Sequence, residues 1–458
     1  MSTSLFDSVL YRHLWGTDEV RELLDESRKL QAWLDIIAVL AEAQAEVGIV
    51  PQDCAQLIRE HADVSLLDID EVAHQTRATG HSTLGLIRCL QQVLPERARE
   101  WVYFGATVQD ITDTWFATVM RSISDTVERD LSSLESEALR LAEQHRDTIM
   151  CGRTHGQPGL PITFGFKAAV WASELRRHRD RLREGRIRWE VVQLGGALGT
   201  MEFWGDSALP LLLAFAQRMR LSVPDIPWLT ARDRIAEFVT LLAMVSATIG
   251  KIGQEIYQLQ RPEIGEVHEP RTPGVVGSIT MPHKINPEIS EHLVTLSRLV
   301  RANASTALEC ILSEHERDGR SWKSEWVVLP EACQLTCVAL KLGIDLLRGL
   351  HVNAHRMKHN VIARGGYVLS APALRLLAGA VGKHTAQQMI YDATMKGQRD
   401  QCTLIEALLS DNRVRRHLSA EDLATVTEAH SALGLAPHFV DRVVGAAGQE
   451  ERKKADDN

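Results

Sequence analysis

Apolar residues recur along much of this chain at alternating steps of three and four, the period of an α-helix that buries one face. The longest such stripe covers residues 235–259, about 37 Å of helix at a rise of 1.5 Å per residue. Shorter stripes lie at residues 123–141, 289–300 and 333–347. The period-two alternation of strands is hard to find. The pattern predicts an all-α protein built on a bundle of long helices, with some apolar faces left for subunit contacts.

Three breaks in this periodicity mark predicted domain edges. Residues 101–105 precede the first long helix, residues 350–366 carry three histidines and end in two glycines, and the end of the chain is strongly charged. We predict three helical domains and a tail: an N-terminal domain over 1–104, a central long-helix bundle over 105–350, a C-terminal domain over 351–446, and a disordered tail over 447–458.

Composition narrows the classes of partner. A chain of 458 residues with 45% hydrophobic residues can bury a large core. The formal net charge of -9, without a run of five or more like charges, argues against a nucleic-acid partner. A small anionic substrate remains compatible, because cationic side chains can gather locally in an acidic protein.

Cysteine usage and hydropathy indicate a cytoplasmic protein. The seven cysteines are widely spaced and form no Cys-x-x-Cys pair, which predicts reduced, mostly buried thiols. Nothing resembles a signal peptide, because charged residues interrupt the first sixteen positions. No 18-residue apolar stretch without charge occurs, so we expect no membrane span.

Residues 261–288 interrupt two long helical stripes with five prolines and three glycines. Neither flanking helix can continue through such a segment. A connection this long inside a domain is usually functional or disordered. Its second half mixes apolar and polar side chains, which suggests a lid with one apolar and one polar side, although composition alone fits an ordinary surface loop equally well.

Residues 277–287 of this loop read Gly-Ser-Ile-Thr-Met-Pro-His-Lys-Ile-Asn-Pro, which resembles the signature loop of the fumarase/aspartase superfamily. Residues 105–114 and residues 153–158 (Arg-Thr-His-Gly-Gln-Pro) resemble two further signature regions, and Gly-Gly-Ala-Leu-Gly-Thr at 195–200 also fits. The blocks keep the family's order over nearly the whole chain. The resemblance implies a homotetramer whose central domains form a 20-helix core, with each active site built from three subunits.

The resemblance also implies a reaction, β-elimination from a succinyl-type substrate. Ser278 is then the base that removes the Cβ proton beside a carboxylate, with Lys284 and backbone N–H groups near Gly277 stabilising its alkoxide. His155 matches the general acid of adenylosuccinate lyases, and Glu291 the carboxylate that pairs with it. Read alone, Ser278 would cap a turn, His155 would be structural, and Glu291 would suit the start of a helix.

A further set of residues matches the family's substrate-binding positions. They combine hydroxyl, amide, imidazole and ammonium groups suited to carboxylates: His81, Ser82, Thr107, Gln109, Thr154, Lys284 and Asn286. Ser82 stands where adenylosuccinate lyases usually carry Asp. Val108 stands where Ser is common, which removes a hydroxyl from the carboxylate pocket.

Residues 316–326 discriminate between branches of the family. Adenylosuccinate lyases carry a Ser-Val-Glu-Arg run there that holds the nucleotide phosphate, whereas this chain reads Ser324-Glu325-Trp326 and resembles the 3-carboxy-cis,cis-muconate cycloisomerase branch. Leu229, Ala231, Ile279 and Ile285 depart from both branches and make the pocket less polar. AMP and adenylosuccinate are therefore expected to bind poorly.

We accordingly expect a lyase that acts on a small succinate-type dicarboxylate, most simply by breaking a C–N bond to release fumarate or a related dicarboxylate. Lactone-forming cycloisomerisation of a muconate and a non-catalytic helical scaffold stay open. No cofactor or metal is expected, because no metal-ligand motif or phosphate loop occurs. His351, His355 and His359 are spaced four apart, but the chemistry needs no Lewis acid.

Overall fold

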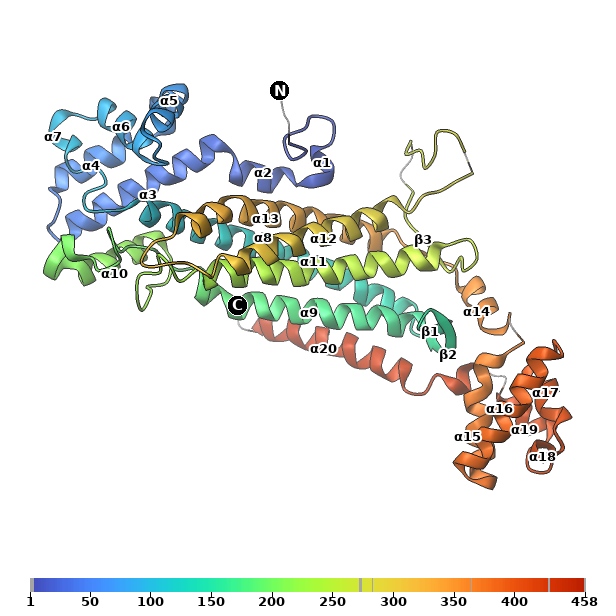
Figure 1. Ribbon diagram of the computed structural model, residues 1–458. Helices are drawn as coiled ribbons and strands as arrows, with labels where there is room; N and C mark the ends of the chain where they lie inside the picture. The colour runs from blue at the N-terminus through green and yellow to red at the C-terminus, as the bar shows by residue number, and fades with distance from the viewer. Residues whose placement is uncertain (1–3, 272–273, 282, 364, 427–428, 457–458) are drawn as a thin grey trace. The chain divides into compact units, whose positions relative to one another are not determined.

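The computed structural model describes residues 4–271, 274–281, 283–363, 365–426 and 429–456. This part of the chain forms twenty α-helices and four short strands (Figure 1). The strands are β1 (Ile149–Thr154), β2 (Gln157–Thr163), β3 (Val267–His268) and β4 (His351–Val352). The helices up to the second hundred residues are α1 (Arg12–Trp15), α2 (Asp18–Leu24), α3 (Glu26–Glu46), α4 (Gln52–His61), α5 (Ile69–Thr79), α6 (Leu84–Val93), α7 (Glu96–Arg99), α8 (Val108–Gln144) and α9 (Phe164–Trp189). The later helices are α10 (Ala208–Met219), α11 (Asp233–Gln260), α12 (Glu288–Glu309), α13 (Gly319–Arg348), α14 (Ala354–Ile362), α15 (Ser370–Val381), α16 (Lys383–Arg399), α17 (Leu404–Ser410), α18 (Asn412–Arg415), α19 (Ala420–Val426) and α20 (Ala436–Asp456).

The long helices carry the predicted apolar seams. All eight positions of the 235–259 stripe lie on α11 and are at most 1% exposed. The 123–141 stripe lies on α8 and is equally buried. Burial of complete seams is what fixes these helices against one another, because their helical propensity alone would not. The all-α prediction is confirmed.

The contacts divide the chain into two compact units. Unit 1 comprises residues 1–130, 178–247 and 295–340, and unit 2 comprises 131–177, 248–294 and 341–458. Helices α8, α9, α11, α12 and α13 each contribute a segment to both units. The division into three domains at 104 and 350 stays a prediction.

Unit 1 holds the N-terminal helices. Helix α3 packs on α4 and α10, and α5 packs on α6. The turn between α5 and α6 begins at Gly80, which takes a left-handed conformation with φ 64° and ends α5. This turn brings the next residues, including His81, to the start of α6.

Unit 2 contains elements that the sequence pattern did not reveal. Strands β1 and β2 form an antiparallel hairpin, and β3 pairs with β4. The hairpin was missed because a register shift between Cys151 and Arg153, together with Pro158 and Pro161, breaks the alternation of apolar and polar residues. Helices α15 to α19 surround a small core of their own.

The predicted disordered tail differs from the structure. Helix α20 continues to Asp456, the last described residue. Ala, Glu, Arg and Lys dominate this segment, and all four favour helix, so a high density of charge did not by itself end the helix.

Among the described residues, α11 and α13 are long and apolar enough to cross a membrane by length and composition. However, 72% and 61% of their most apolar 18-residue windows are buried inside the protein. The seven cysteines are free, and six of them are buried, as their spacing predicted.

Candidate active site

Thr107 stands directly before α8 in unit 1 and meets a cation that the sequence analysis gave no role. Arg317 Nη2 donates to Thr107 Oγ1 at 2.8 Å and to the carbonyl of Ala197 at 3.0 Å. Its Nε is buried and has no hydrogen-bond partner among the described residues. A guanidinium with a spare donor beside a half-buried hydroxyl is suited to a carboxylate.

Asp110 fixes the backbone around Thr107. Its buried carboxylate accepts the N–H groups of Thr107 at 2.9 Å, Gly195 at 2.8 Å and Gly196 at 3.1 Å. Burial raises the pKa of Asp110 to about 6, against the opposing effect of these hydrogen bonds. The signature segments 105–114 and 195–200 are therefore joined through one side chain.

Gln109 is fully buried, which limits its predicted role in substrate binding. Its Nε2 donates to Asp113 Oδ2 and to the carbonyl of Leu229, both at 3.1 Å. Only Oε1 lacks a partner in the described part of the chain. In this arrangement Gln109 has no amide hydrogen to offer a carboxylate.

Asp113, which accepts a hydrogen bond from Gln109, belongs to a buried ion network. Arg232 donates to Asp113 at 2.7 Å and to Glu325 at 3.0 Å, and all three side chains are at most 1% exposed. One cation cannot neutralise two carboxylates, so burial raises the pKa of Glu325 to about 7 despite Arg232. Glu325, part of the segment that discriminated between branches, is thus a structural ion-pair partner here.

His81 and Ser82 follow Gly80 at the start of α6. His81 Nδ1 accepts the N–H groups of Thr83 at 3.4 Å and Leu84 at 3.3 Å. A neutral ring then carries its proton on Nε2, which leaves an N–H donor on an exposed imidazole. Ser82 lies beside it.

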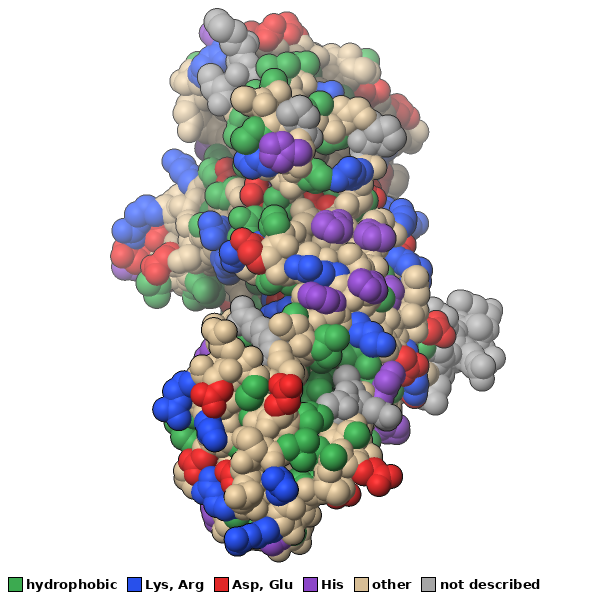
Figure 2. All heavy atoms as spheres, turned by 90° about the vertical axis from the view of Figure 1, so that its right-hand side faces the viewer, with side chains coloured by type: hydrophobic (Ala, Val, Ile, Leu, Met, Phe, Trp, Pro, Cys, Tyr) green, Lys and Arg blue, Asp and Glu red, His purple; other side chains and the backbone are tan. Residues whose placement is uncertain are grey.

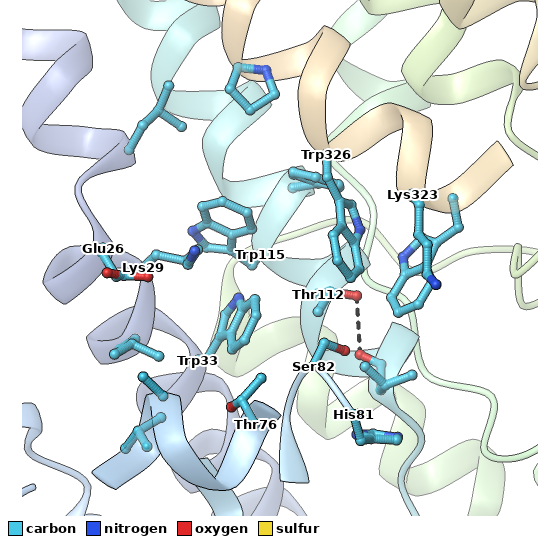
Figure 3. A pocket seen from close by; sticks show the side chains of 18 of the residues that line it. Glu26, Lys29, Trp33, Thr76, His81, Ser82, Thr112, Trp115, Lys323 and Trp326 are labelled. Carbon is cyan, nitrogen blue, oxygen red and sulfur yellow. Dashed lines mark hydrogen bonds between the residues drawn. The ribbon is translucent and has the colours of Figure 1, made fainter. Parts of the chain in front are cut away.

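Both residues line a cavity of about 920 Å³ that lies wholly in unit 1 (Figure 3). The rings of Trp33, Trp115 and Trp326 converge on it from α3, α8 and α13. Val108 also lines it. Its charged lining residues are Glu26, Lys29, Arg77 and Lys323.

In unit 2, His155 occupies the tip of the β1–β2 hairpin. His155 and Gly156 both have positive φ, 52° and 75°, the combination of a type I′ turn. Arg153 anchors the hairpin through two hydrogen bonds to the buried Glu266, at 2.9 and 2.7 Å. Thr154 and His155 are exposed on this rigid base, as suits a general acid that must reach substrate.

In the signature loop, the Ser278 hydroxyl oxygen accepts a hydrogen bond from the backbone. The backbone N–H of Met281 donates to Ser278 Oγ at 3.1 Å. Gly277 permits the turn, since a Cβ there would lie 2.8 Å from the carbonyl of Lys284. The sequence analysis expected backbone donors around Gly277, and the donor present belongs to Met281 instead.

Asn286 closes this loop on itself. Its Nδ2 donates to the carbonyl of Gly277 at 2.7 Å and to Glu288 at 3.2 Å. Both amide hydrogens are therefore used within the loop, so Asn286 shapes it rather than offering donors outward. Lys284 is exposed.

Glu291 lies in the first turn of α12 and is exposed. The helix start is capped by Glu269, which accepts the N–H groups of Ile289 at 3.1 Å and Ser290 at 2.7 Å. Burial raises the pKa of the Glu269 carboxyl. The pairing of Glu291 with His155 stays a prediction.

Two family models match most of the chain. One described as Lyase covers residues 14–301, and one described as Adenylosuccinate lyase C-terminus covers residues 366–443. The chain is a member of the lyase family, in the fumarase/aspartase superfamily.

Relatives of this lyase are enzymes. It is 37% identical over 444 residues to N-acetyl-S-(2-succino)cysteine lyase of Dickeya dadantii, across 97% of this chain and 98% of the relative. It is 35% identical over 428 residues to 3-carboxy-cis,cis-muconate cycloisomerase of Pseudomonas aeruginosa, across 93% of each. The crystal structure of fumarate lyase from Mesorhizobium sp. BNC1 matches with a TM-score of 0.88 at 33% identity, over 94% of this chain and 98% of that one. The scaffold hypothesis is thereby set aside, and this lyase is an enzyme of the superfamily.

The candidate site residues of this lyase fall into two sets. Unit 1 carries His81, Ser82, Thr107 and Gln109, and unit 2 carries Thr154, His155, Ser278, Lys284, Asn286 and Glu291. Within unit 1, Thr107 and Gln109 flank the start of α8, and His81 and Ser82 line the cavity. Within unit 2, the hairpin tip and the signature loop present the proposed acid and base.

Histidines gather beside Lys and Arg on one face of this lyase (Figure 2). His268 and His351 stack across β3 and β4, with ring centroids 6.2 Å apart. His351 is therefore not on α14, which carries His355 and His359, and the regular four-residue spacing does not place the three on one helix. Among the described residues no group of three His, Cys, Asp or Glu is placed to hold a metal ion.

Proposed function

We propose that this lyase catalyses β-elimination from a succinate that carries a sulfur or nitrogen substituent, releasing fumarate and a thiol or an amine. The sequence favoured a C–N bond. The relative from Dickeya dadantii, which aligns over nearly the full length of both chains, makes a C–S bond our first choice.

The observation that carries the proposal is the hydrogen bond from Met281 N–H to Ser278 Oγ. A serine hydroxyl is a poor base, so its alkoxide needs a donor aimed at the oxygen. A backbone N–H held by the loop supplies that donor without further rearrangement. The exposed ammonium of Lys284 adds a positive charge in the same loop.

Two bonds break in this reaction, one from Cβ to hydrogen and one from Cα to the leaving atom. Ser278 takes the Cβ proton, and the electron pair of that C–H bond passes into the neighbouring carboxylate and then forms the new C=C bond. The bond from Cα to sulfur or nitrogen breaks with its electron pair on the heteroatom. His155 gives a proton to the leaving atom, which matters more for an amine than for a thiol because a thiolate is the weaker base.

Arg317 and Thr107 are the best-placed carboxylate binders in unit 1. The guanidinium already donates to the hydroxyl, and its unpartnered Nε gives it capacity for a carboxylate oxygen. We assign them to one carboxylate of the succinyl group. Gln109 is assigned to the support of α8 instead.

Cycloisomerisation is the second candidate, supported by the relative from Pseudomonas aeruginosa. Such a substrate has no leaving group, and a carboxylated muconate offers little apolar surface. The cavity beside His81 is lined by five aromatic side chains, which is poorly matched to that substrate. Elimination therefore ranks first.

We further propose a cytoplasmic homotetramer in which each active site takes residues from several subunits. Apolar side chains on the long helices support this, since Val170, Met244, Leu299 and Leu308 are 40–50% exposed in the single chain. Free thiols suit a reducing compartment.

The test is product formation from matched substrates. N-acetyl-S-(2-succino)cysteine should yield fumarate and a free thiol in equal amounts, whereas 3-carboxy-cis,cis-muconate should not be consumed. Turnover of the muconate to a lactone without fumarate release from any succinyl thioether or amine would replace elimination by the second candidate.

A further inference from the structure

The cavity in unit 1 is larger than a four-carbon dicarboxylate requires. About 920 Å³ lies among α3, α5, α8 and α13 (Figure 3), a volume typical of pockets for drug-sized ligands. Its lining includes Ser82 and Val108, which is the residue next to Thr107. If the succinyl group binds at Thr107, as proposed above, this neighbouring space is available to the leaving group.

Five aromatic rings line the cavity, and four of them hold one another in place as pairs. Trp33 and Trp115 meet edge to face at 6.1 Å, and Trp322 and Trp326 at 4.7 Å. Such rigid rings favour a flat apolar ligand over a hydrated one. The Trp326 side chain reaches into the space from α13.

Two of these indoles carry an unused donor. Nε1 of Trp33 and Nε1 of Trp322 are buried, and neither has a hydrogen-bond partner among the described residues. Both residues are 8% exposed, and both line the cavity. A buried N–H without a partner is costly, and a small rotation of either ring toward the cavity would bring it to a carbonyl oxygen on a bound ligand.

The charged lining adds a preference for an anion. Lys29, Arg77 and Lys323 line the cavity together with one carboxylate, Glu26. Lys29 Nζ lies 5.7 Å from the centroid of the Trp33 ring, so cation and aromatic wall occur together. Glu26 lies in the same turn of α3 as Lys29 and weakens the attraction of Lys29 for a dianion such as a phosphate.

We propose that this cavity binds the leaving group, and that it selects a thiol or amine with an aromatic acyl body and one carboxylate. The proposal rests on the elimination proposed above and specifies its substrate class. Trp326 and Lys29 are the residues that determine the preference, Trp326 for the ring and Lys29 for the carboxylate.

The test measures binding of the leaving group alone, with fumarate at saturation, by calorimetry and by tryptophan fluorescence. N-benzoyl-L-cysteine should bind about tenfold more tightly than N-acetyl-L-cysteine, the gain of one well-packed ring. N-benzoylcysteamine, which lacks the carboxylate, should lose a similar factor. AMP should not bind saturably.

Variants then assign the two preferences. Trp326→Ala should reduce the advantage of the benzoyl group to less than threefold, and Trp326→Phe should restore most of it. Lys29→Gln should remove the advantage of the carboxylate but keep that of the ring. Lys383→Gln, at an exposed position outside the cavity on α16, is the matched control and should change neither.

Equal affinities for the acetyl and benzoyl ligands would overturn the proposal, and so would saturable binding of AMP at least as tight as that of N-benzoyl-L-cysteine. Binding needs no turnover, so the two proposals fail separately. If the benzoyl ligand binds more tightly but no elimination occurs, only the proposed function is rejected. If elimination occurs but the benzoyl ligand has no advantage, only the proposed role of the cavity is rejected.

Discussion

Arg317 is the side chain on which binding of the succinyl group depends most in unit 1. Arg317→Gln removes a charged donor beside Thr107, so kcat/KM for a succinyl thioether should fall about 10- to 150-fold, the equivalent of roughly 1.5–3 kcal/mol. The loss should appear mainly in KM. Steady-state kinetics of fumarate release measure it.

The matched control is Arg320→Gln, three residues later. Arg320 is exposed and pairs with Glu314 and Asp318, so its loss should leave kcat/KM within about twofold. Equal effects of the two substitutions would remove Arg317 from the site.

The raised pKa of Glu325 leads us to predict that the stability of the protein depends on pH. Its pKa in the folded protein, about 7, lies above the ordinary value of 4.5. The stabilisation it contributes is therefore complete below about pH 4.5 and is lost as the pH rises through 7, by at most about 3 kcal/mol. Glu325→Gln should remove this part of the slope in urea unfolding.

Ser324→Ala, at the neighbouring position of α13, should keep the slope of the parent protein. A Glu325→Gln variant whose unfolding free energy still falls over this range as steeply as that of the parent would show that Glu325 remains ionised beside Arg232.

At the residue scale, the sequence gives candidate roles where a role follows from a local motif, and these roles stay predictions. His155 and Ser278 were assigned from continuous motifs, and their exposed turn and loop suit those roles. Arg317 was missed because the hydroxyl it contacts lies 210 positions away. One Gln109 amide hydrogen is used by Asp113, one helical turn away, but the use of the other depends on Leu229, 120 positions away, which only the fold brings close.

Among the elements, the β1–β2 hairpin makes the clearest prediction. Asn followed by Gly is the preferred pair for a type I′ turn, so His155→Asn preserves the backbone while removing the imidazole. Stability should change by less than about 0.5 kcal/mol. The rate of elimination should fall about 100-fold or more for an amine substrate and much less for a thioether.

Thermal unfolding and kinetics with both substrate classes measure these effects. Gly156→Ala is the control for the turn itself, since a left-handed alanine should cost about 1 kcal/mol while the imidazole remains. Full activity of His155→Asn toward an amine substrate would exclude His155 as the acid.

The elements themselves were predicted unevenly. The seam on α11 was found because eight apolar positions keep one period over seven turns, a signal that few other structures produce. The hairpin was missed because two short strands with prolines and a register shift show almost no periodic pattern. The last turns of α20 were taken for a tail, since charge density was weighed above helical propensity.

For the whole molecule, we predict an assembly with shared active sites. Arg317→Gln weakens the unit 1 set of residues, and Ser278→Ala disables the unit 2 set. If sites combine residues of different subunits, mixing the two impaired variants after partial unfolding and refolding should raise kcat/KM above that of either variant alone.

Sedimentation should give a tetramer at micromolar concentration. Each variant refolded alone serves as the control and should keep its own reduced kcat/KM. A monomer in sedimentation, or mixtures no more active than the separate variants, would place each site within one chain.

We propose that Ser278 removes the proton that starts the elimination, and fumarate release by Ser278→Ala is the decisive measurement. With N-acetyl-S-(2-succino)cysteine the parent protein and the loop control Thr280→Ala should both release fumarate and thiol, whereas Ser278→Ala should release neither and unfold at the same temperature as the parent. More than about a tenth of the parent activity in folded Ser278→Ala would contradict the account.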